Sequence, residues 1–123
     1  MSGVILIVED HEGLRCTLAR ILGLFGYETL EAATGHDAIE KTSLMKPNLV
    51  LMDFSLPDMT GAEAAHVIKN NPVTGTIPVI GCSAYFGAEY RDAALISGMV
   101  DYLVKPVSVD LITAKIAKFL EER

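Results

Sequence analysis

The sequence predicts an α/β fold in which helices cover both faces of a parallel β-sheet. Short apolar segments alternate with amphipathic segments five times along the 123 residues, and several of the apolar segments are hydrophobic at every position. A strand without alternation is buried on both faces, which is typical of a parallel sheet between two layers of helices. Right-handed crossovers then restrict the chain to a few doubly wound topologies.

The first part of the chain predicts a strand, a helix and a second strand. The segment VILIV at Val4–Val8 is compact and rich in β-branched residues, as in a buried strand. Apolar residues then recur at helical spacing, and Gly26 follows as a stop signal. These residues are Leu14, Leu18, Ile21, Leu22 and Phe25. Residues 27–33 alternate enough to form a less buried strand.

The middle of the chain repeats the alternation. Gly35–Met45 is expected to be a short helix that is closed by Pro47. The segment LVLMD at Leu49–Asp53 is another fully apolar strand. An alanine-rich helix is expected at Gly61–Asn70, because Pro72 lies just beyond its end.

The last part of the chain contributes two further strand–helix units. Residues 77–84 predict a strand with Pro78 at its start, where proline is tolerated, and a helix within residues 87–98 follows. Residues 101–105 form the fifth strand, and Ser108 is the expected N-cap of the final helix. That helix is marked by Leu111, Ile112, Ile116, Phe119 and Leu120. We expect one domain that comprises residues 1–123.

The composition restricts the classes of partner. Half of the residues are hydrophobic, as in a globular chain, and the formal net charge is -6. The acidic balance argues against direct binding of nucleic acid, because contact with phosphates needs a basic face. Protein partners and metal cations remain compatible with this acidic balance.

Neither a membrane nor an oxidising compartment is indicated. No apolar run approaches the length of a membrane span, and the N-terminus lacks the pattern of a signal peptide, so a cytoplasmic location is expected. Cys16 and Cys82 have no closely spaced partner. We therefore expect two small buried hydrophobic side chains and not a disulfide or a metal site.

Four of the five predicted strands end in a charged or hydroxyl residue. These residues are Glu9 and Asp10, Asp53, Ser83, and Lys105. Ligands of doubly wound sheets bind at the carboxyl ends of the strands. Each residue alone has an ordinary explanation, such as helix capping for Asp10 or a solvated turn for Lys105. Their convergence on one edge favours a common site.

The charges at this edge predict a cation. Two like charges ~4 Å apart repel by about 4 kcal/mol at an effective dielectric near 20. Lys105 offsets part of the repulsion among three carboxylates, and a divalent cation would offset the rest. Hard oxygen ligands suit Mg²⁺ or Mn²⁺. A metal beside a carboxylate, with a lysine and a hydroxyl nearby, suits phosphoryl transfer to an aspartate.

The sequence resembles the receiver domains of two-component response regulators, the CheY-like family. The matching motifs are LIVED, LVLMDFSLPDMTG, IGCSAY and DYLVKP, which occur in the expected order over essentially the whole chain. The resemblance implies a flavodoxin-like sheet of strand order 2-1-3-4-5 with five helices. It also implies a phosphoacceptor that catalyses only its own phosphorylation and slow autodephosphorylation, and is not otherwise an enzyme.

The resemblance implies a role for each matching residue. Asp53 is the expected phosphoacceptor, and Lys105 pairs first with Asp53 and then with the phosphoryl group. Ser83, where the family more often has threonine, bonds a phosphoryl oxygen. Tyr102 is the aromatic switch that turns inward.

A Mg²⁺ site is implied as well. Asp10 and Asp53 would ligate the metal directly, together with the main-chain carbonyl of Ser55, and Glu9 would act through a water. Pro106 would follow a cis peptide, which X–Pro bonds adopt at modest cost.

The resemblance implies that a sensor histidine kinase or a phosphotransfer protein donates the phosphoryl group. For output, a single domain that binds a target protein and a receiver within a longer chain with an effector domain are both open. A phosphorylation-dependent dimer is open too. We further hypothesise that Tyr85 limits autodephosphorylation by shielding the phosphoryl group from water.

Two other functions compete with this interpretation. One is a phosphorylation-independent interaction domain, which the complete set of acceptor and metal-site residues disfavours. The other is a metal-dependent phosphohydrolase. Phosphatases of the haloacid dehalogenase type place a second aspartate two residues after the nucleophile, where this chain has Ser55.

Overall fold

A computed structural model of the chain describes residues 3–85 and 87–121. It contains five strands: β1 (Val4–Val8), β2 (Glu28–Ala32), β3 (Leu49–Asp53), β4 (Val79–Ser83) and β5 (Asp101–Val104). Five helices alternate with them: α1 (Glu12–Leu24), α2 (Gly35–Met45), α3 (Gly61–Asn70), α4 (Ala88–Ile96) and α5 (Val109–Glu121). The predicted alternation is therefore confirmed. The predicted second, fourth and fifth strands are slightly longer than the observed ones.

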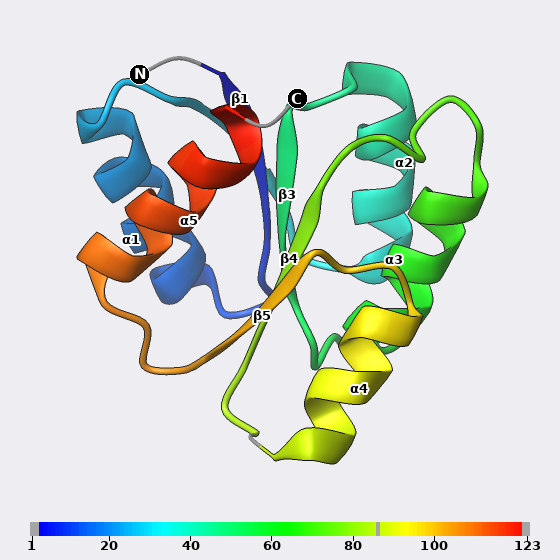
Figure 1. Cartoon of the computed structure of the whole chain (residues 1–123). Coiled ribbons are helices and arrows are strands. Elements are labelled where there is room, and N and C mark those ends of the chain that lie inside the picture. Colours follow the sequence, from blue (N-terminus) through cyan, green and yellow to red (C-terminus); the bar gives the residue numbers. More distant parts are fainter. Residues whose placement is uncertain (1–2, 86, 122–123) are drawn as a thin grey trace.

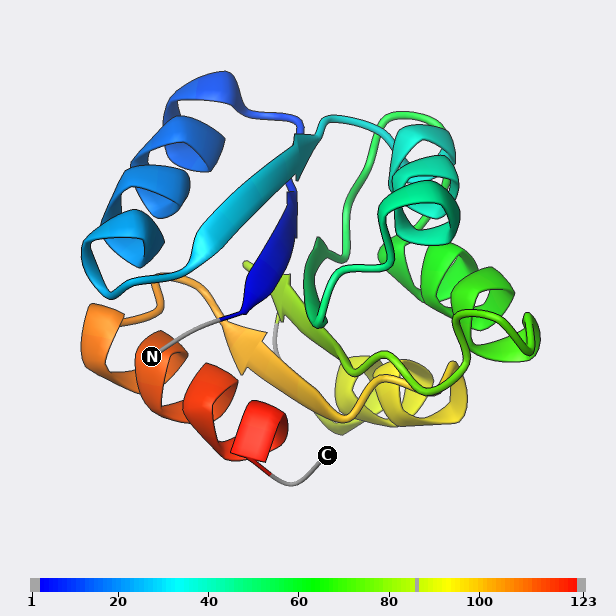
Figure 2. The same ribbon diagram turned by 90° about the horizontal axis from the view of Figure 1, so that it is seen from above.

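The strands form one parallel sheet in the order β2-β1-β3-β4-β5. Helices α1 and α5 cover one face, and α2, α3 and α4 cover the other (Figures 1 and 2). This is the doubly wound architecture, and the strand order, that the resemblance implied. The chain adds β2 on one side of β1 and β3 on the other side, so the carboxyl ends of β1 and β3 lie at the topological switch point.

The sheet separates two hydrophobic cores. Alternate residues of each central strand point to opposite faces: in β1, Leu6 and Val8 join the core under α2, α3 and α4, whereas Ile5 and Ile7 join the core under α1 and α5. All four are at most 1% exposed. The edge strand β2 is less buried, as predicted.

The helix ends follow local signals in the sequence. Helix α1 ends at Leu24, and Gly26 follows with a φ of 96°, a conformation that glycine adopts without strain. Helix α3 begins with a capping box between Thr60 and Glu63. The Oγ of Ser108 accepts a hydrogen bond from the Leu111 N–H, in agreement with its predicted capping role.

Two sequence-based expectations are corrected by the structure. Cys16 is exposed, because it lies on the side of α1 that faces away from Leu18 and Leu22, the residues that pack on the sheet. Cys82 is only partly buried. Both are free thiols.

Among the described residues, no helix is both long and apolar enough to cross a membrane.

Candidate functional site

Three carboxylates meet at the carboxyl ends of β1 and β3. Glu9 and Asp10 follow β1 directly, and Asp53 is the last residue of β3. The two strands are neighbours in register, with Val8 opposite Met52, so Glu9 and Asp53 extend from adjacent strand ends. Each of the three residues offers a carboxylate oxygen, and these oxygens lie within 4.8 Å of one another.

Local structure keeps Asp10 available for this cluster. The N-cap of α1 is His11, whose Nδ1 accepts a hydrogen bond from the Leu14 N–H at 3.1 Å. The alternative in which Asp10 caps the helix is therefore wrong. Asp10 is exposed, whereas Glu9 is 5% and Asp53 is 7% exposed.

Lys105 places an ammonium group between two of the acids. Its Nζ lies 2.7 Å from Glu9 Oε1 and 3.5 Å from Asp53 Oδ2. The side chain comes from the segment after β5, and the cis peptide between Lys105 and Pro106 confirms the predicted one. Three carboxylates and one ammonium leave an excess of negative charge in a largely buried crevice.

The two buried carboxylates differ in acidity. Burial raises the pKa of Asp53 to about 6; the Lys105 ammonium opposes this shift and the Glu9 carboxylate adds to it. Burial also acts to raise the pKa of Glu9, but hydrogen bonds from Lys105 and from the His11 N–H outweigh it and hold this pKa below its usual value. Glu9 is therefore the Lys105 partner, and Asp53 is the less well compensated acid.

An apolar cavity adjoins the Asp53 carboxylate. It has a volume of about 430 Å³ and is lined by Glu9, Asp53 and Lys105 together with apolar residues of α1, α5 and the sheet. Apolar walls strengthen the interactions between the charges beside them. They also raise the free-energy cost of any carboxylate that has no cationic partner.

The loop after β3 folds back so that Gly61 lies against the backbone of Asp53 and Phe54. The Ser55 N–H donates to Asp53 Oδ1 at 3.3 Å, and the Gly61 N–H donates to the Phe54 carbonyl at 2.7 Å. A Cβ atom at Gly61 would lie 2.3 Å from the Asp53 carbonyl oxygen, which excludes any larger residue without a backbone shift. The loop therefore holds the Ser55 backbone close to the Asp53 carboxylate, and the role of the Ser55 carbonyl as a metal ligand stays a prediction.

Ser83 is the last residue of β4, the strand beside β3, and Tyr102 lies on the next strand, β5. Ser83 is 1% exposed, and its Oγ accepts the Tyr85 N–H at 3.1 Å. The ring of Tyr102 is buried, and its hydroxyl donates to the Tyr85 carbonyl at 2.7 Å. The ring also contacts Phe54 edge-on, with centroids 5.8 Å apart. The Tyr102 ring is therefore buried, and its role as a switch stays a prediction.

The donor set fits a hard divalent cation. All three acidic side chains supply oxygen, and their net charge exceeds what Lys105 neutralises. Such a set suits Mg²⁺, which uses one or two carboxylates and retains waters. A bound cation would also lower the pKa of Asp53, because it favours the charged carboxylate that burial disfavours.

Two contacts near the site were missed by the sequence analysis. Arg15 of α1 donates to the Glu9 main-chain carbonyl at 2.8 Å. Asp58 accepts hydrogen bonds from the N–H groups of Gly35 and His36 at the start of α2, at 2.8 and 2.9 Å. An arginine five residues after the acid pair was the one visible signal for the first contact.

The chain is similar to known signalling proteins. Residues 5–117 match the response regulator receiver domain. The transcriptional regulatory protein PdtaR of Mycobacterium tuberculosis is 38% identical over 112 residues, which cover 89% of this chain and 53% of that protein. The sensor histidine kinase RcsC of Escherichia coli is 36% identical over 118 residues, or 96% of this chain and 12% of the kinase. The chain thus spans only about half, or much less, of the length of these curated relatives.

Solved structures show the same fold. A CheY-like receiver domain protein from Methanospirillum hungatei is 32% identical, with a TM-score of 0.90 over 99% of this chain and 96% of that chain. The receiver domain of a histidine kinase from Syntrophus aciditrophicus is 30% identical, also with a TM-score of 0.90, over 98% of this chain and 91% of that chain. Phosphoryl transfer to an aspartate is the general function of these domains. The chain belongs to the response regulator receiver domain family of two-component systems.

Proposed function

We propose that Asp53 is the phosphoacceptor of this receiver domain. The observation that carries the proposal is its position: Asp53 ends a central strand, shares a crevice with Glu9 and Asp10, and lies 3.5 Å from the Lys105 ammonium. In the transfer, an Asp53 carboxylate oxygen forms a bond to phosphorus as the phosphorus–nitrogen bond of a phosphohistidine breaks. The histidine nitrogen keeps the bonding electron pair and is protonated.

The neighbouring residues hold and neutralise the phosphoryl group. Lys105 moves its interaction from the carboxylate to a phosphoryl oxygen, and the Ser83 hydroxyl donates a hydrogen bond to another. Asp10, Asp53 and the Ser55 main-chain carbonyl would hold Mg²⁺, with Glu9 acting through a water. When bound, the metal would neutralise negative charge on the transferring group. The same site would let water slowly hydrolyse the acyl phosphate.

The phosphoryl donor is proposed to be a phosphohistidine on a sensor kinase or phosphotransfer protein. Two of the similar proteins are named as histidine kinases and one as a transcriptional regulator, which supports a place in a phosphorelay. Phosphorylation would switch a protein-binding surface. This surface would bind either a separate target protein or an effector domain of a longer chain.

The test is NMR of the protein with beryllofluoride and Mg²⁺, compared with Asp53→Asn. We expect shifts at Ser83, Tyr102 and Lys105 in the wild type and none in the variant. Unchanged wild-type spectra would overturn the proposal in favour of a phosphorylation-independent interaction domain. Sustained turnover of small phosphoesters would instead support a phosphohydrolase, which the serine at position 55 disfavours.

A further inference from the structure

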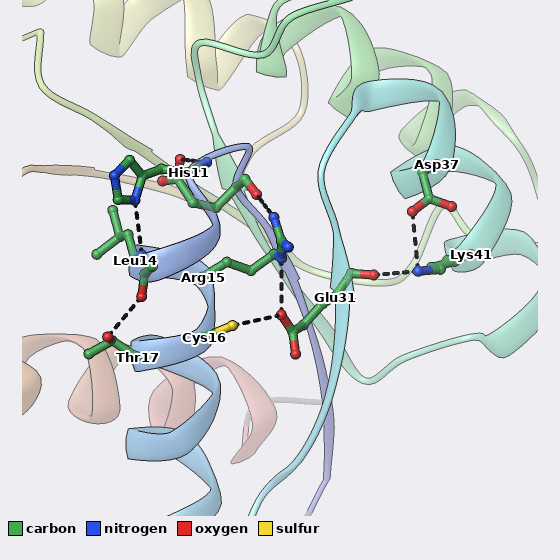
Figure 3. Close-up of polar contacts among 10 residues, drawn as sticks. His11, Leu14, Arg15, Cys16, Thr17, Glu31, Asp37 and Lys41 are labelled. Atoms are coloured by element: carbon green, nitrogen blue, oxygen red, sulfur yellow. Dashed lines mark hydrogen bonds and ion pairs between the residues drawn. The ribbon is translucent and has the colours of Figure 1, made fainter.

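Arg15 joins the acid loop to the edge strand of the sheet. The residue lies in the first turn of α1, and its side chain is 16% exposed. One guanidinium nitrogen, Nη1, donates to the Glu9 main-chain carbonyl at 2.8 Å, and another, Nε, donates to Glu31 Oε1 at 3.0 Å. Figure 3 shows the side chain directed from the helix toward Glu31 on β2.

The contact with Arg15 completes the fixation of Glu9. The Glu9 N–H donates to the Ala32 carbonyl at 3.0 Å, which extends the β1–β2 ladder. Its two carboxylate oxygens accept from Lys105 and from the His11 N–H. The carbonyl that Arg15 holds belongs to the peptide joining Glu9 to Asp10, so this contact fixes the backbone from which Asp10 extends. Asp10 itself is exposed.

Glu31 in turn orients the guanidinium. Its carboxylate accepts from Arg15, while its main-chain carbonyl accepts from Lys41, which also pairs with Asp37 at 3.1 Å (Figure 3). The planar fork of arginine makes two directed hydrogen bonds, whereas lysine offers a compact point charge. Replacing Arg15 with lysine therefore keeps the charge and loses this geometry.

We propose that Arg15 is a positioning residue for the metal site, because it fixes the Glu9–Asp10 peptide so that both carboxylates face one cation. The inference rests on the Mg²⁺ site of the proposed function. Arg15 affects Mg²⁺ affinity in two opposing ways: its positioning of the ligands strengthens binding, whereas its positive charge weakens it. The guanidinium repels a nearby cation, so loss of its charge alone would strengthen Mg²⁺ binding. Loss of a group that orients metal ligands weakens binding, typically by 10–100-fold.

The experiment is a Mg²⁺ titration of the whole chain, followed by NMR of the backbone amides. We expect Arg15→Gln and Arg15→Lys each to weaken Mg²⁺ binding by about tenfold. Arg20→Gln is the matched control, because it removes the same charge from an exposed position on the same helix. It should keep the wild-type affinity or bind slightly more tightly. Affinity in Arg15→Gln equal to or above that of the wild type would overturn the inference. If Arg15→Lys binds Mg²⁺ with wild-type affinity, the two directed hydrogen bonds of the guanidinium have no positioning role.

Glu31→Gln keeps the inference testable if the Arg15 variants fail to fold. It removes the group that orients the guanidinium and should weaken Mg²⁺ binding by a few-fold, whereas Asp37→Asn removes the same charge from the outer end of the network and should not. Equal affinities in these two variants would contradict the inference. A wild type that binds no Mg²⁺ would refute the proposed function instead. Thermal unfolding without metal separates a general loss of stability from a loss of metal affinity.

Discussion

Asp53 and Glu9 are neighbouring carboxylates whose acidities shift in opposite directions. The Lys105 ammonium lies closer to Glu9 than to Asp53, at 2.7 against 3.5 Å, and the Glu9 carboxylate also accepts the His11 N–H. Asp53 has less compensation and is buried beside an apolar cavity. A cation at this crevice would relieve that cost, so the residue with the least favourable charge is also the one proposed to accept the phosphoryl group.

Replacing Asp53 with asparagine is expected to stabilise the metal-free protein at neutral pH. The folded protein raises the Asp53 pKa to about 6, whereas an unfolded Asp titrates near 3.9. Wild-type stability therefore falls as the pH rises from about 4 to about 6 and stays lower above it. Asp53→Asn avoids this loss, which for a rise of about two pKa units is about 3 kcal/mol.

Urea unfolding in the presence of a chelator, at about pH 4 and about pH 7, measures this effect. The gain of Asp53→Asn should be present at the higher pH and absent at the lower one. If the variant is less stable than the wild type at neutral pH, the ionised Asp53 carboxylate does not destabilise the metal-free fold and the prediction is wrong. Asp92→Asn, an exposed change on α4, serves as the control.

Tyr85 is expected to slow hydrolysis of the phosphorylated form. It lies two residues after Ser83, its side chain is 54% exposed, and its ring stacks on Tyr90 with centroids 5.4 Å apart. Tyr85→Ala removes the ring that we expect to shield the phosphoryl group from water, and it should accelerate autodephosphorylation by severalfold. The rate of phosphate release from phosphorylated protein tests it, and hydrolysis at the parent rate would refute the shielding role.

At the level of elements, Asp58 connects the loop after β3 to the start of α2. Its carboxylate accepts the Gly35 and His36 N–H groups, and His36 Nδ1 lies 2.6 Å from Asp58 Oδ2. Helix N-termini carry unpaired N–H groups and favour negative charge. Thr34 caps the same turn through its side chain. The loop that follows Asp53 is thereby joined to the start of α2, the helix that connects β2 to β3.

Asp58→Asn should destabilise the protein in a pH-dependent manner. The N–H groups of Gly35 and His36 hold the pKa of Asp58 well below its usual value. A lowered pKa stabilises the fold above the unfolded value near 3.9, and this contribution is lost as the pH falls below it. The stability difference between wild type and variant should therefore be largest at neutral pH and shrink below about pH 4. Thermal melts over this range would test it, and a difference that does not depend on pH would contradict it.

For the whole molecule, one sheet divides two cores that share every central strand. Leu22 of α1 belongs to one core and Ile68 of α3 to the other, and both are at most 1% exposed. Because neighbouring residues of β1, β3 and β4 enter different cores, neither core can be lost without disrupting the sheet. We therefore expect unfolding in a single transition.

Leu22→Ala and Ile68→Ala should each lower the free energy of unfolding by roughly 2–5 kcal/mol. The midpoints from circular dichroism and from tyrosine fluorescence should coincide in both variants. Leu24→Ala, at a position that is 87% exposed, should change stability by less than about 0.5 kcal/mol. Separate transitions for the two optical probes would show that the cores unfold independently.

The periodicity of the sequence was enough to predict the elements and the edge of the sheet where the site lies. Strand β3 is apolar at every position from Leu49 to Met52 because both of its faces are covered, and this pattern is visible without coordinates. Glu9, Asp53, Ser83 and Lys105 could be assigned to one edge because parallel strands align their carboxyl ends. The strand order came from the family resemblance.

Other features depend on contacts between elements that are distant in the chain. Helical periodicity did not show that Cys16 would be exposed, that His11 and not Asp10 would cap α1, or that Asp58 would reach Gly35. It also did not pair Arg15 with Glu31 and the Glu9 carbonyl. The physical reason is that burial of apolar faces follows from local spacing, whereas a polar side chain finds its partner only after packing has brought separate segments together.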